Sequence, residues 1–578
     1  MENKQLKKLI EVASGRQVAD LVIKNCKVID VYNSTIINGD IAICDDEIAG
    51  IGEYSGQNEI DAKGQYASPG FIDSHIHIES SYVSPEELGK LLVPHGATTI
   101  IADPHEIVNV CGIDGLDYML AAAKGTSLDI KFMLPSCVPA TPFEHSGATI
   151  DAKAMEEPIK NDKIIGLGEF MNYPGVINAD SDVLDKLILA KNSGKLIDGH
   201  SPFLEGKALN AYAAAQIHTD HECSTIKEMT DRLSRGIYVL LREGSACHDL
   251  EKLIKGVTVE NSRRCLLCSD DRQPKTILEL GHLDHHLRIC VREGINPITA
   301  IQMASLNAAE CFRLTDRGAI APGLRADIVL FDNLQDFNIS KVFIEGREVA
   351  SKGRYLLPLK KYSIDSVKVQ FSVRDFSKDK LKLKLKSNKV YVIDILPGGV
   401  LTGKGIADVN TNLSGEFVYN ENAPIAKVAV VERHQNTGNV AVALLRNYGI
   451  TSGAIALSIA HDSHNIITVG VNDEDMELAI NTLIEQGGGI VLAKNNKVLE
   501  AMPMPIGGIM SDQSGEWVNN QLIKIHNTAH NELGISSNVE PVMTLCFMSL
   551  AVIPEIKITD MGLFDVTAYK FINVEVGL

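Results

Sequence analysis

The sequence has no uninterrupted run of 18 apolar residues, which is about the length that a membrane-spanning helix needs. Its N-terminus, MENKQLKKLIEVASGRQ, is a charged amphipathic segment without the apolar core of a signal peptide. Basic charge is in deficit, because 55 Lys and Arg face 74 Asp and Glu for a net charge of -19. Nucleic acids and anionic membrane surfaces both need a basic face on their partner. We therefore expect neither as a partner, and we expect a cytoplasmic protein.

The cysteines show no disulfide framework. They number 11, an odd count, and are scattered from Cys26 to Cys546, which is typical of buried thiols in a reducing compartment. Cys265 and Cys268 form a C-x-x-C, but no second pair completes a zinc site, and residues three apart in a strand face opposite ways. We interpret both as core residues.

Between residues 69 and 310 one pattern recurs: a short apolar run, a polar or glycine-rich break, and an amphipathic helix-like stretch. The runs are PGFIDSHIH, TTIIADPHE, KFMLPSCVP, KIIGLGE, KLIDGH, QIHTDHE, IYVLLREGS and RCLLCSDD. Eight strand-like runs alternating with helices over roughly 240 residues are typical of a (β/α)8 barrel. We therefore predict an α/β protein built around a TIM-like barrel at residues 69–310.

The segments on either side of the barrel have the pattern of strands and turns. Residues 19–53 alternate apolar and polar side chains around NGD, and residues 323–354 do likewise. Neither segment could bury a face alone, so we predict one small β domain from residues 1–68 and 311–360. Residues 361–578 are predicted to form an additional α/β domain. Its His434, His461 and His464 lie either in a polar loop or in a lid or oligomer contact.

Polar residues fall at the C-terminal ends of the barrel runs. They are His75, His77, Asp103, His105, Glu169, His200, His221, Glu243 and Asp270. Any one of them alone would be interpreted as a strand end that meets solvent, but barrel enzymes build active sites at this end from several strands. His75 and His77 are also two residues apart, so both imidazoles point the same way from a strand. The pattern predicts one site shared by several strands.

Six of these residues have the side chains of a metal centre: His75, His77, Glu169, His200, His221 and Asp270. Imidazole nitrogen and carboxylate oxygen suit a divalent transition ion, and a catalytic site keeps a position open for water. Six ligands exceed the need of one four-coordinate ion, so we expect two ions that share Glu169 and a bridging hydroxide. Asp270, on the last strand, can contact one ion and accept the proton of that water. It is the predicted general base.

The chain resembles the amidohydrolase superfamily in the placing of its polar residues. It has an H-x-H on the first strand, single histidines at the ends of the fifth and sixth strands, and an aspartate at the end of the eighth. Many of its binuclear members bridge their metals with a carboxylated lysine on strand four, where this chain has Glu169 in GLGEF. With ADPHE, LIDGHSP, TDHECST, LLREGS, CSDDR, AHDSHN and MPIGGIMS, the chain resembles the adenine deaminase family. The likeness covers essentially the whole chain and is densest from residue 69 to 275.

The resemblance implies hydrolytic deamination of adenine, a small-molecule purine, to hypoxanthine with release of ammonia. A bridging hydroxide would add to C6 while Asp270 takes its proton, and another acid would protonate N1 and the leaving amine. Asp103 and His105 are the candidates for substrate hydrogen bonding and proton transfer, and Glu243 and Ser245 for contacts with the ring edge. Asp103 has a second interpretation, as the N-cap of the helix that follows it.

The family suggests Mn2+ or Fe2+ as the two divalent metal ions, and Zn2+ also suits a His-rich, carboxylate-bridged site without thiolate. We further expect a homo-oligomer, a dimer. Two alternatives stand beside this hypothesis. Another cyclic-amide hydrolase of the superfamily, such as a dihydropyrimidinase or dihydroorotase, would need the carboxylated lysine that strand four lacks. A metal-free barrel that serves as a scaffold would be expected to have lost ligands, and this chain has a full set.

Overall fold

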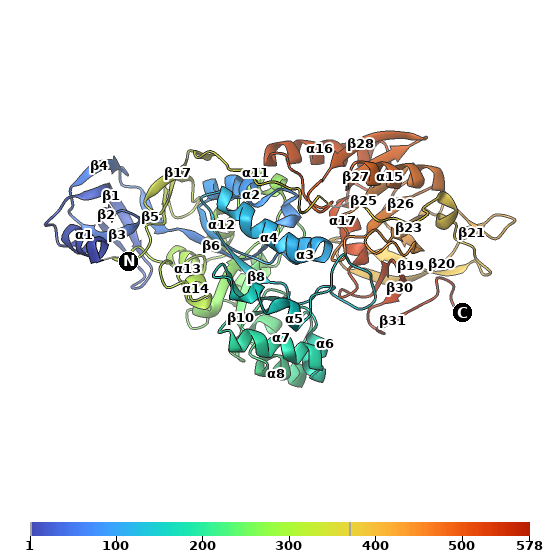
Figure 1. The fold of residues 1–578 in the computed structure, drawn as a ribbon, viewed down its shortest axis with the longest axis horizontal. Coiled ribbons are helices and arrows are strands. Elements are labelled where there is room, and N and C mark those ends of the chain that lie inside the picture. Colours follow the sequence, from blue (N-terminus) through green and yellow to red (C-terminus); the bar gives the residue numbers. More distant parts are fainter. Residues whose placement is uncertain (1–2, 369–370, 578) are drawn as a thin grey trace.

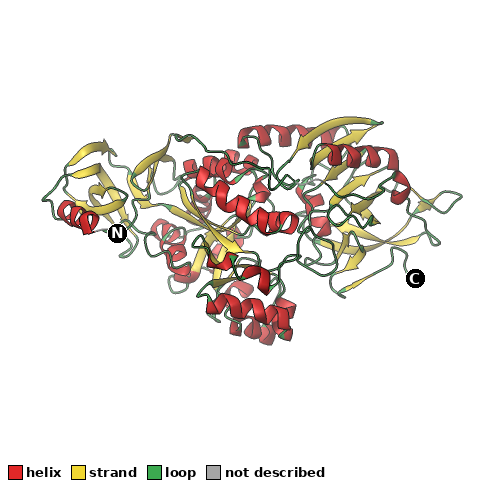
Figure 2. Cartoon of the chain, viewed as in Figure 1, coloured by secondary structure: helices red, strands yellow, loops and turns green. Residues whose placement is uncertain are grey.

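The structure is a computed structural model that describes residues 3–368 and 371–577. Three regions follow one another along the long axis of the molecule in Figure 1: a β-rich region at the N-terminal end, a central barrel, and a mixed region that contains the C-terminus. Figure 2 shows that strands dominate the two ends and helices surround the centre. None of the helices in the described residues is long and apolar enough to cross a membrane.

The predicted barrel strands form in order. They are β6 (Phe71–His77), β7 (Ala97–Ala102), β8 (Asp129–Leu134), β9 (Ile164–Phe170), β10 (Leu196–Gly199), β11 (Thr219–Asp220), β12 (Tyr238–Arg242), β13 (Cys265–Cys268) and its short continuation β14 (Asp270–Asp271). All of them pair in parallel, in the orders β10-β9-β8-β7-β6-β14 and β11-β12-β13. Between β10 and β11 the backbone N–H of His218 donates to the carbonyl of Ile197 at 2.8 Å. The barrel prediction is confirmed.

The first and last strands of the barrel are locked together by Asp73 on β6. Its carboxylate accepts hydrogen bonds from the backbone N–H of Ser269, at 3.1 Å, and from the Ser269 hydroxyl, at 2.6 Å. The ring of His282 also approaches it, with Nε2 3.0 Å from Oδ2. All three residues are fully buried. Because buried carboxylates are costly unless they are paired, Asp73 fixes the register in which the barrel closes.

Parallel strands covered on both sides are expected to be apolar throughout, and β7, with the sequence ATTIIA, is buried at every position. The covering helices follow the strands: α2 (Pro85–Leu92), α3 (His105–Cys111), α4 (Ile113–Ala122), α7 (Ser181–Asn192), α8 (Gly206–Ala214), α9 (Ile226–Leu233) and α12 (Leu283–Arg292). Helix α9 begins at a capping box, in which the Thr225 hydroxyl accepts the N–H of Glu228 and donates to the Glu228 carboxylate. This cap fixes the start of α9 a few residues after β11 ends.

Segments from both flanks of the barrel form one sheet, in the order β18-β17-β16-β15-β5-β1-β2-β3, with β4 beside β1. From the N-terminal flank come β1 (Ala19–Asp30), β2 (Thr35–Cys44), β3 (Glu47–Gly52), β4 (Gly56–Asp61) and β5 (Tyr66–Pro69); from the other come β15 (Ile328–Phe331), β16 (Ile339–Ile344), β17 (Arg347–Ser351) and β18 (Arg354–Tyr355). The join is the antiparallel pairing of β15 with β5. Since β5 runs directly into β6, the sheet lies at the end where the barrel strands begin.

The C-terminal region is built on a second sheet, in the order β20-β19-β24-β23-β26-β25-β27-β28. Its strands are β19 (Lys389–Ile395), β20 (Thr402–Asp408), β23 (Ile425–Val431), β24 (Val440–Arg446), β25 (Ala454–Leu457), β26 (Ile466–Gly470), β27 (Gly489–Lys494) and β28 (Lys497–Pro503). Helix α15 (Asp473–Glu485) packs on β25, β26 and β27, and α16 (Gly515–Asn531) on β28. The short α17 (Met543–Cys546) lies near the barrel. This α/β region covers the end where the barrel strands finish.

The structure forms no disulfides. All 11 cysteines are free, and Cys111 and Cys247 are partly exposed while the others are buried. Cys265 and Cys268 are fully buried within β13, in the core that the sequence predicts for them.

Candidate metal centre

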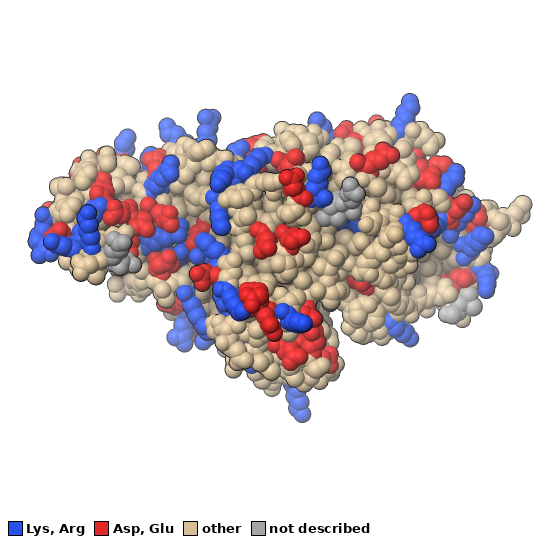
Figure 3. Space-filling view, viewed as in Figure 1, with Lys and Arg blue, Asp and Glu red and all other residues tan. Residues whose placement is uncertain are grey.

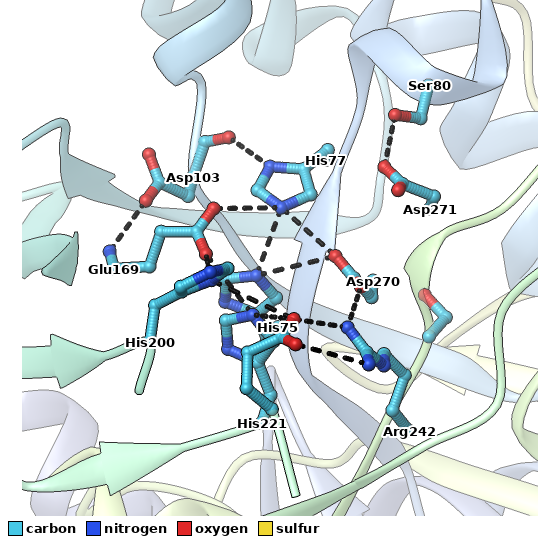
Figure 4. Close-up of polar contacts among 12 residues, drawn as sticks. His75, His77, Ser80, Asp103, Glu169, His200, His221, Arg242, Asp270 and Asp271 are labelled. Carbon is cyan, nitrogen blue, oxygen red and sulfur yellow. Dashed lines mark hydrogen bonds and ion pairs between the residues drawn. The ribbon is translucent and has the colours of Figure 1, made fainter. Parts of the chain in front are cut away.

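A cavity of about 380 Å³ opens at the C-terminal ends of the barrel strands. Among the residues that line it are His77, His105, Glu169, His200, His221 and Asp270. His75 lies directly behind His77 and is fully buried. The structure therefore brings all six predicted metal ligands to one place (Figure 4). His105 lies with them, 3.3 Å from Glu169.

His75 and His77 point at one another from β6. Their Nε2 atoms are 3.1 Å apart, and Asp270 Oδ1 is 3.1 Å from Nε2 of His77 and 3.7 Å from that of His75. Each Nδ1 faces an acceptor: the carboxylate of Asp198 at 2.9 Å for His75, and the carbonyl of Asp103 at 3.0 Å for His77. We assign the ring protons to these Nδ1 atoms, which leaves two lone pairs and a carboxylate oxygen facing each other. Such a convergence of acceptors fits a cation.

Glu169 stands at the centre of the cluster, as Figure 4 shows. Its Oε1 is 3.3 Å from His77 Nε2 and 3.3 Å from His105 Nδ1. Its Oε2 is 2.6 Å from His200 Nδ1 and 3.2 Å from His221 Nε2. The two carboxylate oxygens thus face two different sets of imidazole nitrogens.

The position of Glu169 depends on the residue before it. A Cβ added to Gly168 would lie 2.1 Å from Oδ2 of Asp103, so a side chain at this position would displace Asp103. That Oδ2 atom accepts the backbone N–H of Glu169 at 2.8 Å. Asp103 makes no capping hydrogen bond to α3, whose N-cap residue is Pro104. In the structure Asp103 therefore orients the end of β9, and its interpretation as a helix cap is not seen.

The charges of the cluster are strongly interdependent. Burial raises the pKa of Glu169, but the charges and hydrogen bonds of His200 and His221 hold it well below its usual value. Burial lowers the pKa of His221, yet contact with Glu169 and the charge of Asp270 raise it to about 10. The pKa of His77 likewise lies well above its usual value, because Asp270 and Glu169 outweigh burial. Without ions, the carboxylates thus favour protonated histidines at this site. Bound metal ions would supply the same positive charge.

Asp270 is shared between the imidazoles and an arginine that sequence analysis missed. Its Oδ2 accepts a hydrogen bond from Nη1 of Arg242 at 2.9 Å. Arg242 also contacts Glu222 and binds Asp249 at 3.0 Å. Burial raises the pKa of Asp270, but the hydrogen bond from His77 and the charge of Arg242 hold it well below its usual value. The carboxylate is therefore ionised and able to accept a proton.

Two of the residues that the sequence predicts for substrate contacts lie elsewhere. Glu243 accepts a hydrogen bond from His248 Nδ1 at 2.7 Å, and Ser245 donates to the Thr276 hydroxyl at 2.7 Å. Neither is among the residues that line the cavity. Their neighbour Arg242 lines it instead, because successive residues at a strand end point in opposite directions. A substrate contact of Glu243 or Ser245 stays a prediction.

The C-terminal region supplies the opposite wall of the cavity. It contributes Pro397, Gly398, Val400, Leu401, His461, Asp462, Phe547, Leu550, Ile553 and Pro554. His461 and Asp462 belong to AHDSHN, which the sequence marks without assigning a role. Asp462 Oδ1 lies 3.7 Å from His105 Nε2. One wall is thus polar and the other mainly apolar, which suits a flat heteroaromatic molecule with polar edges.

The outer surface differs from the cavity. On the face shown in Figure 3, Lys and Arg side chains are interspersed with Asp and Glu over all three regions. This agrees with the acidic balance of the sequence, which is not that of a nucleic-acid-binding surface.

Two family models match consecutive parts of the chain. Residues 66–349 match the amidohydrolase family model, and residues 399–570 match the adenine deaminase C-terminal domain model. "Adenine deaminase 2" of Desulfotalea psychrophila is 65% identical over 575 residues, and "Adenine deaminase" of Ligilactobacillus salivarius is 53% identical over 576 residues; each alignment covers 100% of both chains. Among solved structures, a beta-aspartyl dipeptidase of Fervidobacterium islandicum AW-1 has a TM-score of 0.46 and 19% identity, covering 59% of this chain and 99% of that chain.

Proposed function

Because the chain belongs to the adenine deaminase family, within the amidohydrolases, we propose that it hydrolyses adenine to hypoxanthine and ammonia. The observation that supports this most directly is the position of Glu169. It lies between two sets of imidazole nitrogens, at the edge of a cavity with a largely apolar opposite wall. A centre of this kind needs no carboxylated lysine. A dihydropyrimidinase would need one on strand four, where this chain has Glu169, so the position of Glu169 disfavours that alternative.

The residues present fit two divalent ions. His75, His77 and Asp270 would hold one and His200 and His221 the other, with Glu169 common to both. The ring nitrogens of His200 and His221 on the side away from Glu169, Nε2 and Nδ1, are buried without a hydrogen-bond partner in the described residues. The contacts with Glu169 are made by the other nitrogen of each ring. The nitrogen and oxygen donors suit Mn2+, Fe2+ or Zn2+. When bound, the ions supply Lewis acidity, which lowers the pKa of water to about 7.

Asp270 accepts the proton of the attacking water in this proposal. The carboxylate is ionised, is held by Arg242, and faces the ligand nitrogens with its other oxygen. Addition of water to C6 places a hydroxyl on the purine and a proton on Asp270. That proton then moves to the departing amine, so adenine and water become hypoxanthine and ammonia with no net proton change.

His105 is the proposed donor to N1 of the purine. It lines the cavity and lies 3.3 Å from Glu169. Burial lowers the pKa of His105, but the charge of Asp462 and the nearby carboxylates raise it well above its usual value. His105 therefore carries a proton at neutral pH. After it gives that proton to N1, it regains one from the C6 hydroxyl, which loses its proton as the carbonyl of hypoxanthine forms. Asp103 acts indirectly, through the end of β9.

The substrate is tested by activity on a small panel. Ammonia release is measured from adenine, adenosine, cytosine and guanine, and ring opening from dihydrouracil, with Mn2+-loaded protein. We expect adenine to react far faster than the others, and faster reaction of a nucleoside or a pyrimidine would overturn the assignment. Failure of every compound, on protein that also binds no metal, would favour the metal-free scaffold alternative.

The bridging role of Glu169 is tested by Glu169→Gln, which keeps the size and removes the charge. We expect the second ion to be held weakly, since the shared anionic ligand is lost. Metal per chain after gel filtration is the measurement. Glu243→Gln is the matched control, because Glu243 directly follows β12 and pairs with His248 outside the cluster. Unchanged metal content in Glu169→Gln would contradict the bridge. The cytoplasmic location and the homodimer stay predictions.

A further inference from the structure

A second group of nitrogen and oxygen donors lies in the wall of the cavity, where α3 of the barrel meets the loop after β25; Glu106 and His461 line the cavity and His464 lies behind them. Glu106 Oε1 is 3.4 Å from His461 Nδ1, and Glu106 Oε2 is 3.7 Å from His464 Nε2. One donor atom from each residue falls within 4.8 Å of the others. All three side chains are buried, and His464 is fully inaccessible to solvent. These separations suit donors around one small cation.

His464 is the residue whose contacts are least explained. Neither of its ring nitrogens has a hydrogen-bond partner among the described residues. Its backbone also adopts the left-handed conformation, with a φ of 56°, which is uncommon for a residue other than glycine. Burial and the neighbouring positive charges hold the pKa of His464 well below its usual value, so the ring is neutral. A neutral imidazole with a free lone pair is the form that binds metals.

The charge around this group is unbalanced. Ser80 places its hydroxyl within 3.0 Å of Glu106 Oε1 and within 2.5 Å of Asp271 Oδ1, although a hydroxyl has only one proton to donate (Figure 4 shows the Asp271 contact). Glu79 lies close by and has an unpartnered buried Oε2. Within residues 3–368 and 371–577, no Lys or Arg forms an ion pair with Glu79, Glu106 or Asp271. Burial and the charge of Glu106 raise the pKa of Glu79 to about 8, which neutralises that carboxyl near pH 7. A bound cation would stabilise the buried carboxylates that remain.

We propose that Glu106, His461 and His464 bind a third divalent cation, separate from the pair that Glu169 bridges. The two histidines come from the C-terminal region and the glutamate from the barrel, so the ion would fasten the two regions together at the rim of the cavity. None of the three residues belongs to the ligand set of the deamination centre. The proposal therefore predicts a metal stoichiometry and a stability effect that deamination alone does not require.

Mn2+ alone is the probe, added to full-length protein from which metal has been removed by a chelator. Bound Mn2+ per chain is counted by elemental analysis after gel filtration and by EPR of free Mn2+ during titration. We expect three ions for the parent protein, two for His464→Gln and three for His526→Gln. The control residue His526 is a largely buried histidine of the same region that pairs with Glu540 at 2.8 Å. Two ions in the parent protein at saturating Mn2+ would overturn the proposal.

Two further variants locate the third ion. Glu169→Gln should lose one ion of the bridged pair and keep the ion at His464. The double variant Glu169→Gln with His464→Gln should therefore bind one Mn2+ per chain fewer than Glu169→Gln alone. Three ions in both His464→Gln and His461→Gln would place the extra ion elsewhere and contradict the assignment. If His464→Gln does not fold, Glu106→Gln, which can keep the Ser80 contact, takes its place. Mn2+ should also raise the melting temperature of the parent protein by more than that of His464→Gln.

Discussion

The two regions that flank the barrel meet it in opposite ways. The N-terminal sheet adjoins the beginnings of the strands, where β5 continues into β6 and Asp129, at the start of β8, binds Arg317 at 2.7 Å. None of its described residues lines the cavity. The C-terminal region instead covers the strand ends and provides a whole wall of the cavity, including His461, Asp462 and Phe547.

The difference follows from the direction of the strands. In a parallel barrel all strands finish at the same edge, so side chains and loops for chemistry gather there, while the opposite edge is free to serve stability. We therefore expect substitutions at the two edges to have different effects. Those at the strand ends should lower turnover with little loss of stability, and those at the strand beginnings should lower stability with little loss of turnover.

The largest effect is expected for Asp270→Asn, at a strand end. The variant should fold and keep most of its metal, yet lose on the order of 10² to 10⁴ in turnover, the usual contribution of a positioned acid or base. Turnover, metal content and melting temperature are measured on one preparation. Near-normal turnover with both bridged ions present would mean that another residue is the base.

Asp129→Asn tests the opposite edge. Asp129 is buried and also binds Lys163 at 2.7 Å. The substitution removes the carboxylate charge that faces Arg317 and Lys163, and although Arg317 keeps its ion pair with Asp316, it should cost about 2 kcal/mol of stability. Turnover per folded chain should stay within about twofold. A large fall in turnover, with stability unchanged, would break the comparison.

The effect of Asp129→Asn should depend on pH in a defined direction. Burial raises the pKa of Asp129, but Arg317, Lys131 and Lys163 lower it well below its usual value. A carboxyl whose folded pKa is depressed stabilises the protein above its unfolded pKa of about 4 and loses that contribution as the pH falls. The difference in melting temperature between parent and variant should therefore be full at neutral pH and shrink in acid.

A smaller effect on turnover is expected for Asp462→Asn, in the C-terminal wall. Because Asp462 helps to raise the pKa of His105, the variant should lose about 10- to 100-fold in kcat/KM, the range for residues that orient a catalytic group. The high-pH limb of the rate profile should also move to lower pH, since His105 then loses its proton more easily. Asp379→Asn, an exposed aspartate of the same region, is the control. An unshifted pH profile would mean that Asp462 does not influence proton transfer through His105.

The smallest effect is expected for Lys557→Met. Lys557 is fully buried and donates only to the carbonyl of Val400, at 2.8 Å, and burial lowers its pKa to about 7. The unfolded chain binds this proton up to a pH of about 10, so the lysine costs stability near pH 7 and costs less as the pH rises. The variant should be more stable by on the order of 1 kcal/mol at pH 7. The difference in melting temperature between the parent protein and Lys557→Met should be smaller at pH 9 than at pH 7. An equal difference at both pH values would contradict this account.

Prediction from sequence succeeded where the signal is local. The strands were visible because buried parallel strands are continuously apolar, and the donor residues because each ends its run. Arg242 and Glu222 were missed although each adjoins a residue that was named, Glu243 and His221. A shift of one position at a strand end turns a side chain to the other face, and no pattern in a single sequence resolves such a shift.

By itself the sequence determined the barrel, the edge at which its polar residues gather, and the chemical type of the donors, because periodicity and strand termini are properties of neighbouring residues. Only the tertiary structure decided which of these groups meet. Asp462 reaches His105 across more than 300 residues of chain, and Asp270 meets Arg242 rather than solvent. Such contacts depend on how the C-terminal region packs over the strand ends, which is a long-range balance of burial and charge that no short motif encodes.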